Sequence, residues 1–341
     1  MIDLQRRIVL MTKLGEYLSS NDENLIEAID NAHRANGWFI PEFVQLSIHN
    51  IAQYFLKEEL LNNWIAQYPR IAAEQVQPKK VGIVMAGNIP LVGFHDFLCA
   101  FISGHHLKVK LSSKDTVLWK HIFSKLQEWE TSFEQSVEVS EMLKGCDAYI
   151  ATGSNNSARY FEFYFQKYPH IIRKNRSSVA ILDGTESAAD LEHLSDDVCQ
   201  YFGLGCRNVT QLYVPKEYAF EALLAAFNKY LSHIDHNKFK NNYDYQLALY
   251  LLNQQYYMSN GHLLLVEADT VYAPISVVHY QQYEDKEQLI ATLADRDEVQ
   301  CISMREPVEK NAKLLRFGAN QQPSLTDYAD GVDTMRFLAD L

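Results

Sequence analysis

The stretch that begins at Val81 constrains the fold most, because it joins an apolar run to a tight turn and then to a helix. Val81-Gly-Ile-Val-Met-Ala86 is typical of a buried parallel strand, and Gly87-Asn88-Ile89-Pro90 is a turn. The residues that follow, 92–102, favour an apolar helix. Alternating strands and helices with short connections predict a doubly wound α/β fold with a parallel sheet. Further strand-like runs occur at 106–111, 148–151 and 179–182.

Composition excludes several classes of protein. A net charge of -12 over 341 residues argues against non-specific nucleic-acid binding, which needs a basic face. No apolar run approaches the roughly 18 residues of a membrane span, and the first residues lack the apolar core of a signal peptide, so we expect a cytoplasmic protein without a membrane span. The five cysteines lack paired spacing, so neither a disulfide framework nor a metal site is expected.

Cys206 is the candidate nucleophile. It lies in Phe202-Gly-Leu-Gly-Cys-Arg-Asn-Val-Thr210, between a helix-like stretch and the strand-like residues 211–214. Small, flexible neighbours make a thiol accessible, and the following strand fixes its backbone, as covalent catalysis requires. A reactive thiol also needs thiolate character, for which Arg207 is the nearest cation in the sequence. A small buried hydrophobe is the alternative interpretation, and it suits most of the other cysteines.

Two strand-to-helix turns are candidate ligand sites. Asn88 follows the first strand at the carboxyl edge of the sheet, where open α/β folds bind ligands, and its amide can donate to an oxyanion. An ordinary Gly-Asn-x-Pro turn explains the same residues. Gly153 and Ser154 follow the strand at 148–151, where backbone N–H groups could hold a pyrophosphate. An ordinary helix N-cap at Ser154 explains that turn equally well.

Two basic segments are candidate phosphate sites. Lys108, Lys110 and Lys114 flank Ser112 and Ser113 around the end of the second strand, where a dinucleotide-binding fold reads the adenosine ribose. Lys110 and Ser113 are the candidate cofactor contacts there. Lysines in place of a carboxylate favour NADPH there, with NADH as the alternative. Arg173, Lys174 and Arg176 could receive phosphate groups of CoA, although a charge run of this kind also forms solvated loops.

Taken in order, these segments resemble the aldehyde dehydrogenase superfamily, most closely its fatty acyl-CoA reductase branch (LuxC type), from about Val81 to Gly318. The resemblance implies that Asn88 helps to form an oxyanion hole and that Lys110 contacts the adenosine ribose. It also implies that Thr152-Gly153-Ser154 is the pyrophosphate turn and that Cys206 is the nucleophile, eight residues before Val214.

The same resemblance implies the domain organisation. We expect an aldehyde-dehydrogenase-like α/β fold, in which residues 1–178 form N-terminal helices and a Rossmann-like NAD(P)-binding domain with a doubly wound parallel sheet. Residues 179–310 are expected to form an α/β catalytic domain that carries Cys206. Residues 311–341 are expected to form a C-terminal segment.

Departures from the superfamily pattern point to the reaction. The hydrolytic branch carries a general-base Glu roughly 34 residues before the nucleophile, where this chain has His170-Ile-Ile-Arg-Lys174 without a carboxylate. Hydrolysis of a thioester needs an activated water, so the lack of this general-base Glu favours transfer of the acyl group between Cys206 and a carrier thiol. A later Glu that holds the nicotinamide ribose is replaced in the segment 269–274.

The sequence therefore predicts an NAD(P)H-dependent acyl-CoA reductase that forms an aldehyde through a Cys206 thioester. Acyl-CoA is the expected partner, NADPH the expected cofactor, and a homo-oligomer is left open. One alternative is an oxidative aldehyde or semialdehyde dehydrogenase. The other is a degenerate family member that binds nucleotide or acyl-CoA without turnover, which the replaced ribose Glu keeps open.

Overall fold

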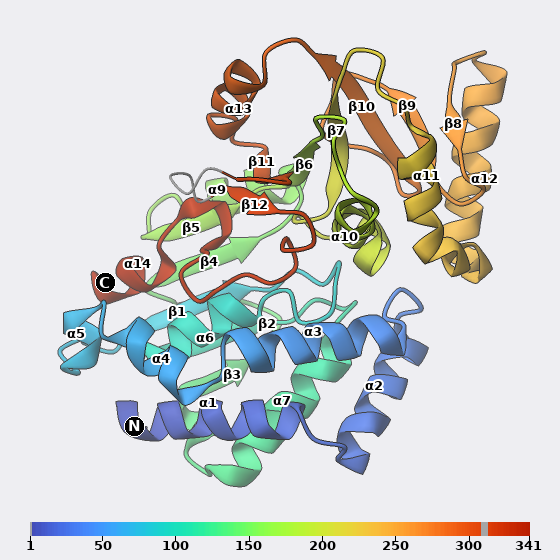
Figure 1. The fold of residues 1–341 in the computed structure, drawn as a ribbon. Coiled ribbons are helices and arrows are strands. Elements are labelled where there is room, and N and C mark those ends of the chain that lie inside the picture. The colour runs from blue at the N-terminus through green and yellow to red at the C-terminus, as the bar shows by residue number, and fades with distance from the viewer. Residues whose placement is uncertain (1, 308–312) are drawn as a thin grey trace. The chain divides into compact units, whose positions relative to one another are not determined.

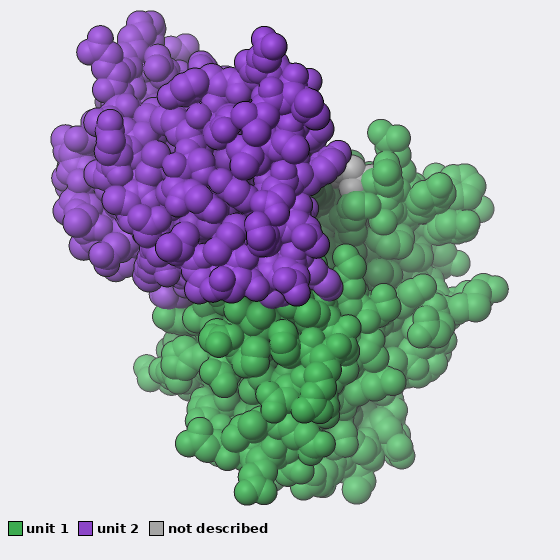
Figure 2. Space-filling view, turned by 90° about the vertical axis from the view of Figure 1, so that its right-hand side faces the viewer, with its two compact units in different colours: residues 1–175, 323–341 green, residues 176–322 purple. Residues whose placement is uncertain are grey.

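The computed structural model describes residues 2–307 and 313–341 and contains two compact units (Figure 2). Unit 1 consists of Met1–Asn175 with Pro323–Leu341, and unit 2 consists of Arg176–Gln322. The sequence had placed the first boundary at residue 178 and had treated 311–341 as one segment. In the structure the last residues of the chain return to unit 1, while those just before Pro323 belong to unit 2.

Unit 1 begins with five helices and continues as a strand–helix alternation (Figure 1). The first helices are α1 (Leu4–Leu18), α2 (Glu23–Ala35), α3 (Pro41–Tyr54), α4 (Glu58–Ile65) and α5 (Pro69–Ala72). The alternation consists of β1 (Lys80–Val84), α6 (Phe94–Ile102), β2 (His106–Lys110), α7 (Thr116–Trp129), α8 (Phe133–Ser136), β3 (Val137–Val139), β4 (Ala148–Thr152), α9 (Asn155–Phe165) and β5 (His170–Arg173). After the return from unit 2 come η3 (Ala329–Gly331) and α14 (Thr334–Ala339).

The sheet of unit 1 is parallel and has the strand order β3-β2-β1-β4-β5. From β1 the chain adds β2 and β3 on one side, then crosses over and adds β4 and β5 on the other side. The direction of winding therefore reverses between β1 and β4. Such a reversal leaves a crevice at the carboxyl ends of the two central strands, where dinucleotide folds bind their ligand. The turn after β1 carries Asn88, and the turn after β4 carries Gly153 and Ser154.

Helix α6 fixes the first of these turns, because every one of its residues except His95 is buried. It contacts β1 and β2 on one side and α1 and α14 on another. Its aromatic side chains stack on α7, since the rings of Phe94 and Phe97 lie 6.0 and 5.6 Å from that of Trp119. A helix that is apolar on all sides must be enclosed, as the sequence predicted for residues 92–102.

Unit 2 contains a second, mixed sheet of seven strands. Its strand order is β12-β11-β6-β7-β10-β9-β8, and the pairs are parallel except for β8 with β9. The elements are β6 (Ser177–Ile181), α10 (Ala188–Cys199), η1 (Gln200–Gly203), β7 (Val209–Pro215), α11 (Glu221–Phe227), η2 (Asn228–Asp235), α12 (Asn237–Leu252), β8 (Met258–Ser259), β9 (Leu264–Glu267), β10 (Val277–Tyr283), α13 (Lys286–Ala294), β11 (Val299–Met304) and β12 (Leu314–Arg316). Two sheets of this kind confirm the predicted α/β fold.

Candidate active site

Cys206 lies in a tight turn between η1 and β7, at the amino end of a central strand of unit 2. The N–H of Asn208 donates to the carbonyl of Gly205 at 3.1 Å, which closes a four-residue turn. Cys206 and Arg207 therefore occupy the two central positions of this turn. The Arg207 guanidinium donates to the buried Cys301 sulfur at 3.5 Å and to the carbonyl of Asn320 at 3.4 Å, whereas the Cys206 side chain is half-buried.

Both central carbonyls of the Cys206 turn are hydrogen-bonded. The hydroxyl of Ser178, on β6, donates to the carbonyl of Cys206 at 3.1 Å and accepts the N–H of Cys301 at the same distance. The side-chain amide of Asn320 donates to the carbonyl of Arg207 at 2.9 Å. The backbone around the thiol is thus held by groups from distant parts of unit 2.

Cys206 differs from the other cysteines in exposure, and all five lie in the described residues. Cys206 is half-buried, whereas the other four are buried. Burial in apolar surroundings raises the pKa of the Cys99, Cys146 and Cys199 thiols, because it disfavours the thiolate. Solvent access leaves Cys206 as the thiol that a substrate can reach.

The turn that carries Asn88 is packed against the residues after β2. Asn88 itself is exposed, while Leu91, at the end of the turn, is buried with a φ of 55°. The N–H of Leu91 donates to the carboxylate of Asp115 at 2.7 Å, and burial raises the pKa of this carboxyl to about 8. A Cβ on Gly87 would lie 2.5 Å from the Ser112 hydroxyl oxygen, so only glycine fits there.

Lys110 and Ser113 lie at the carboxyl end of β2, and both side chains are exposed. Lys110 is in register with Val84 on β1, one strand away from the switch point. The nearest carboxylate in sequence, Asp115, is buried and bonded to Leu91, so it does not compete for a ligand. This end of β2 is therefore polar and cationic.

Gly153 and Ser154 form the connection from β4 to α9. The hydroxyl of Ser154 accepts the N–H of Ser157 at 3.3 Å and so acts as the N-cap of α9. A Cβ on Gly153 would lie 2.9 Å from that of Ser157, so the chain needs glycine to approach the helix closely. Ser154 thus has the N-cap role that the sequence left open, and the start of α9 lies at the ligand-binding edge of the sheet.

The three predicted phosphate ligands after β5 do not form one cluster. Arg173 is buried, and its guanidinium donates to both carboxylate oxygens of Asp96, at 2.7 and 3.2 Å, to the Thr334 hydroxyl and to the carbonyl of Ala329. It therefore ties the C-terminal residues of unit 1 to α6, which corrects its interpretation as a phosphate ligand.

The two neighbouring cations are more accessible. Lys174 is exposed and pairs with Glu162 on α9 at 2.9 Å. Arg176 is half-buried and begins unit 2. Of the three candidates Arg173, Lys174 and Arg176, only Lys174 and Arg176 keep a side chain that solvent reaches.

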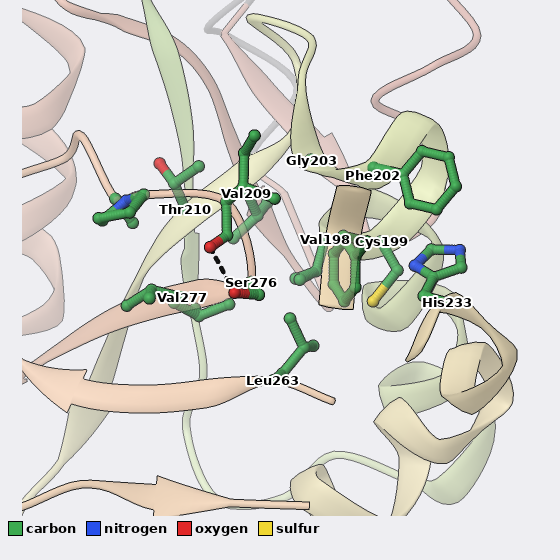
Figure 3. A pocket seen from close by; sticks show the side chains of 15 residues that line it. Val198, Cys199, Phe202, Gly203, Val209, Thr210, His233, Leu263, Ser276 and Val277 are labelled. Atoms are coloured by element: carbon green, nitrogen blue, oxygen red, sulfur yellow. Dashed lines mark hydrogen bonds between the residues drawn. The ribbon is translucent and has the colours of Figure 1, made fainter. Parts of the chain in front are cut away.

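A small cavity adjoins the segment that leads into the Cys206 turn (Figure 3). Its volume is about 20 Å³, which suits about one water molecule rather than an acyl chain. Phe202 and His233 lie on one side of it in Figure 3, and burial lowers the pKa of this histidine to about 3. The cavity is lined by Leu263 and by residues of α10, η1, β7, η2, α12, β10 and the segment before β10.

Sequence reasoning missed the residues that anchor both turns. Asp115, Ser178 and Asn320 carry no local signal, because their partners lie 24, 28 and 113 residues away in the chain. Asn208 stands within the Cys206 segment and could have been found from its place two residues after the thiol. Side chains that hold a functional turn are therefore visible mainly in the fold.

In the part of the chain that the structure describes, no helix is both long enough and apolar enough to span a membrane. Among the same residues, no group of three His, Cys, Asp or Glu side chains could hold a metal ion.

The fold is similar to that of aldehyde dehydrogenases and related oxidoreductases. An oxidoreductase from Marinobacter aquaeolei has a TM-score of 0.70 at 12% identity, over 94% of this chain and 79% of that one. An NADP-dependent enzyme from E. coli has a TM-score of 0.67 at 12% identity, over 89% and 73%. The Mycobacterium tuberculosis aldehyde dehydrogenase complexed with NAD+ has a TM-score of 0.60 at 14% identity, over 88% and 73%.

These similarities show that the chain has the fold of aldehyde dehydrogenases. No curated protein matches the chain in sequence. Residues 49–272, more than half of the chain, match the family described as acyl-CoA reductase (LuxC). The chain belongs to this family of NAD(P)H-dependent oxidoreductases, as the resemblance of its motifs predicted.

Proposed function

We propose that this protein reduces a fatty acyl-CoA to the corresponding aldehyde with NADPH, through a thioester on Cys206. The observation that carries the proposal is the state of Cys206, a half-buried thiol in a turn whose carbonyls are bonded, while the other four cysteines are buried. Membership of the acyl-CoA reductase family supplies the substrate class.

In the first step the Cys206 thiolate attacks the carbonyl carbon of the acyl-CoA thioester. The carbonyl oxygen becomes an oxyanion, and the backbone N–H of Cys206 and the side-chain amide of Asn88 are the proposed donors to it. Collapse of this intermediate breaks the bond between the carbonyl carbon and the CoA sulfur. CoA leaves as a thiolate, and the acyl group remains on Cys206.

Unit 1 is the proposed site of the cofactor. Lys110 and Ser113 would hold the adenosine ribose and its 2′-phosphate, and the turn of Gly153 and Ser154 would hold the pyrophosphate at the start of α9. When bound, NADPH supplies the hydride that reduces the thioester carbon. The resulting thiohemiacetal alkoxide on Cys206 then collapses, which breaks the bond between the carbon and the Cys206 sulfur, returns the thiolate and releases the aldehyde. The proton consumed in the overall reaction is taken up by the CoA thiolate that left in the first step.

Reduction is favoured over oxidation to a free acid, because the chain lacks the hydrolytic carboxylate. The segment in which the superfamily places its general base is strand β5 here, with the sequence His170-Ile-Ile-Arg173. Arg173 is bonded to Asp96 within unit 1, which gives that end of β5 a structural role. Without a base to activate water, the thioester on Cys206 persists until it is reduced.

The decisive experiment replaces Cys206 by alanine and follows two signals, oxidation of NADPH with palmitoyl-CoA and transfer of a labelled acyl group to the protein. We expect Cys206→Ala to lose both, with turnover reduced by at least about 10³-fold, as for removal of a covalent nucleophile. The same assay with NADH tests the assignment of Lys110, which predicts faster reduction with NADPH at low cofactor concentration.

Cys146→Ala is the matched control, because Cys146 is a buried thiol in unit 1 and has no proposed role. It should retain both signals. Labelled acyl transfer to Cys206→Ala at the wild-type rate would show that the thiol does not carry the acyl group. Release of free acid from an aldehyde with NAD+ and without CoA would favour the oxidative alternative.

A further inference from the structure

Helix α10 ends in an unusual way directly before the Cys206 turn. Three successive residues have positive φ angles, Tyr201 at 54°, Phe202 at 57° and Gly203 at 73°. Only glycine adopts this region without steric cost, so Tyr201 and Phe202 are strained. Such strain persists only where surrounding contacts hold the backbone in place. The contacts that do so are the natural place to look for control over the nucleophile.

The ring of Phe202 packs against those of His233, His236 and Phe239, and the side-chain amide of Asn208 binds the backbone on both sides of the strained segment. Asn208 is completely buried, and its Nδ2 donates to the carbonyls of Asp197 at 3.0 Å and Gln200 at 2.9 Å, with that of Val198 further away at 3.4 Å. The last carbonyls of a helix have no partner within the helix. Asn208 therefore caps the C-terminus of α10 from a position beyond the chain reversal.

The same amide also holds the Cys206 turn. Its Oδ1 accepts the N–H of Gly205, the residue before Cys206, at 2.8 Å. One rigid planar group thus joins the end of α10 to the start of the turn and uses both its donor and its acceptor. Aspartate has the same shape but no N–H, so it would place a carboxylate against the helix carbonyls.

The opposite side of the turn is held by a second set of contacts. Ser178 and Asn320 bind the two central carbonyls, as described above. Asn320 is itself fixed, since its N–H donates to the carboxylate of Asp197 at 3.1 Å and its Oδ1 accepts the Ser303 hydroxyl at 2.9 Å. Asp197 belongs to the last turn of α10, so both sets of contacts begin at the same helix end.

We propose that Asn208 is the positioning residue of the nucleophile. Its amide ties the strained end of α10 to the Cys206 turn and so fixes the position of the Cys206 thiol. The inference rests on the proposed function, because Asn208 affects the reaction only if Cys206 is the nucleophile. Displacement of a reacting group by about 1 Å can cost about 10²-fold in rate. If Gly205 were no longer held by Asn208, the turn could move and displace the Cys206 thiol by about this distance.

Asn208→Asp is the test, measured by two rates on the full-length protein. One is transfer of the acyl group from labelled palmitoyl-CoA to Cys206, and the other is alkylation of Cys206 by iodoacetamide, followed by mass spectrometry of its peptide. We expect acyl transfer to slow by at least about tenfold and alkylation to change by more than threefold. The KM for NADPH should stay within twofold, because the cofactor residues lie in unit 1.

Asn260→Asp is the matched control for loss of a structural amide in unit 2. Asn260 makes a similar set of bonds, since its Nδ2 donates to the carbonyl of Leu224 and its Oδ1 accepts the N–H of Leu263. It ties α11 to the loop before β9 rather than to the Cys206 turn. We expect this variant to lower the melting temperature while both rates stay within twofold of wild type.

Ser178→Ala provides the second variant in case Asn208→Asp does not fold. It removes one hydroxyl from β6 and frees the Cys206 carbonyl, and we expect acyl transfer to slow by about three- to tenfold. Folded variants at either position that react at wild-type rates would overturn the proposal. If the wild-type protein is not acylated by palmitoyl-CoA, the proposed function is wrong. The role of Asn208 can still be tested in that case, because alkylation of Cys206 needs no acyl-CoA.

Discussion

The turn that carries Asn88 and the turn that carries Cys206 are anchored by different chemistry. In unit 1 a buried carboxylate, Asp115, accepts the N–H of Leu91. In unit 2 the direct anchors of the turn are neutral, namely the hydroxyl of Ser178 and the amides of Asn208 and Asn320. An ionisable group that binds a turn directly makes the turn sensitive to pH, whereas the hydroxyl and amides that bind the Cys206 turn do not titrate. The carboxyl of Asp197, whose pKa burial raises to about 7, acts on the Cys206 turn only through Asn320.

The two turns also differ in how closely they are packed. Gly87 has no room for a Cβ, because the Ser112 side chain fills that space, next to the proposed cofactor residue Ser113. The Cys206 turn is held mainly by hydrogen bonds and leaves its thiol half-exposed. Close packing would suit the donor role proposed for Asn88, and a half-exposed thiol would suit the acyl-carrier role proposed for Cys206.

The largest effect that separates the two turns is expected from Asn88→Ala. Loss of one oxyanion donor typically slows the reaction about 10²–10³-fold, so labelled acyl transfer from palmitoyl-CoA to Cys206 should fall by that factor. Alkylation of Cys206 by iodoacetamide should stay within twofold, because this reaction forms no oxyanion. Asn208→Asp, by contrast, should change both rates. An equal loss of alkylation in Asn88→Ala would show that Asn88 acts through the nucleophile rather than on the oxyanion.

A smaller effect is expected from Gly87→Ala, which tests the packing of the Asn88 turn. The new Cβ would lie 2.5 Å from the Ser112 hydroxyl oxygen and 2.7 Å from its Cβ, so we expect a loss of about 1–3 kcal/mol in the free energy of unfolding by urea. Adding Ser112→Gly removes the clash, and the double variant should be more stable than the sum of the two single changes predicts. Additive losses of unfolding free energy would show that a Cβ at position 87 does not clash with the Ser112 side chain.

The existence of the Asn88 and Cys206 turns could be predicted from the sequence, since their signals are local. Glycine, asparagine and proline after an apolar run identify the Asn88 turn, and the glycines around Cys206 identify an accessible thiol. The α/β class follows from the same alternation. These features need only residues that are neighbours in the chain.

The anchors could not be predicted, because they depend on which strands become neighbours. Ser178 reaches Cys206 only because β6 pairs with β7, and Asn320 reaches Arg207 from 113 residues further along the chain. Arg173 was misinterpreted for the same reason. Its charge indicated a ligand, but β5 and the returning C-terminal residues enclose it with Asp96. Charge runs therefore predict little until the burial of each side chain is known.

The smallest effect concerns the ionisable anchor and appears in the pH dependence of stability. Burial raises the pKa of Asp115 from 3.8 to about 8, so the folded state binds its proton more tightly than the unfolded state does. Its contribution to stability is complete below about pH 4 and is lost as the pH rises through about 8. Asp115→Asn keeps an oxygen that can accept the Leu91 N–H but cannot ionise.

Urea unfolding of both proteins at pH 5, 6.5 and 8 measures this contribution as the difference between wild type and Asp115→Asn. From pH 5 to pH 8 we expect the free energy of unfolding of wild type to fall by at least about 1.4 kcal/mol relative to that of the variant, which is the equivalent of one pKa unit. Other titrating groups are common to both proteins and cancel. A constant difference would show that Asp115 is ionised at all three values. The ratio of the Cys206 alkylation rates of the two proteins should stay constant over the same series, because the groups that directly hold the nucleophile turn are neutral.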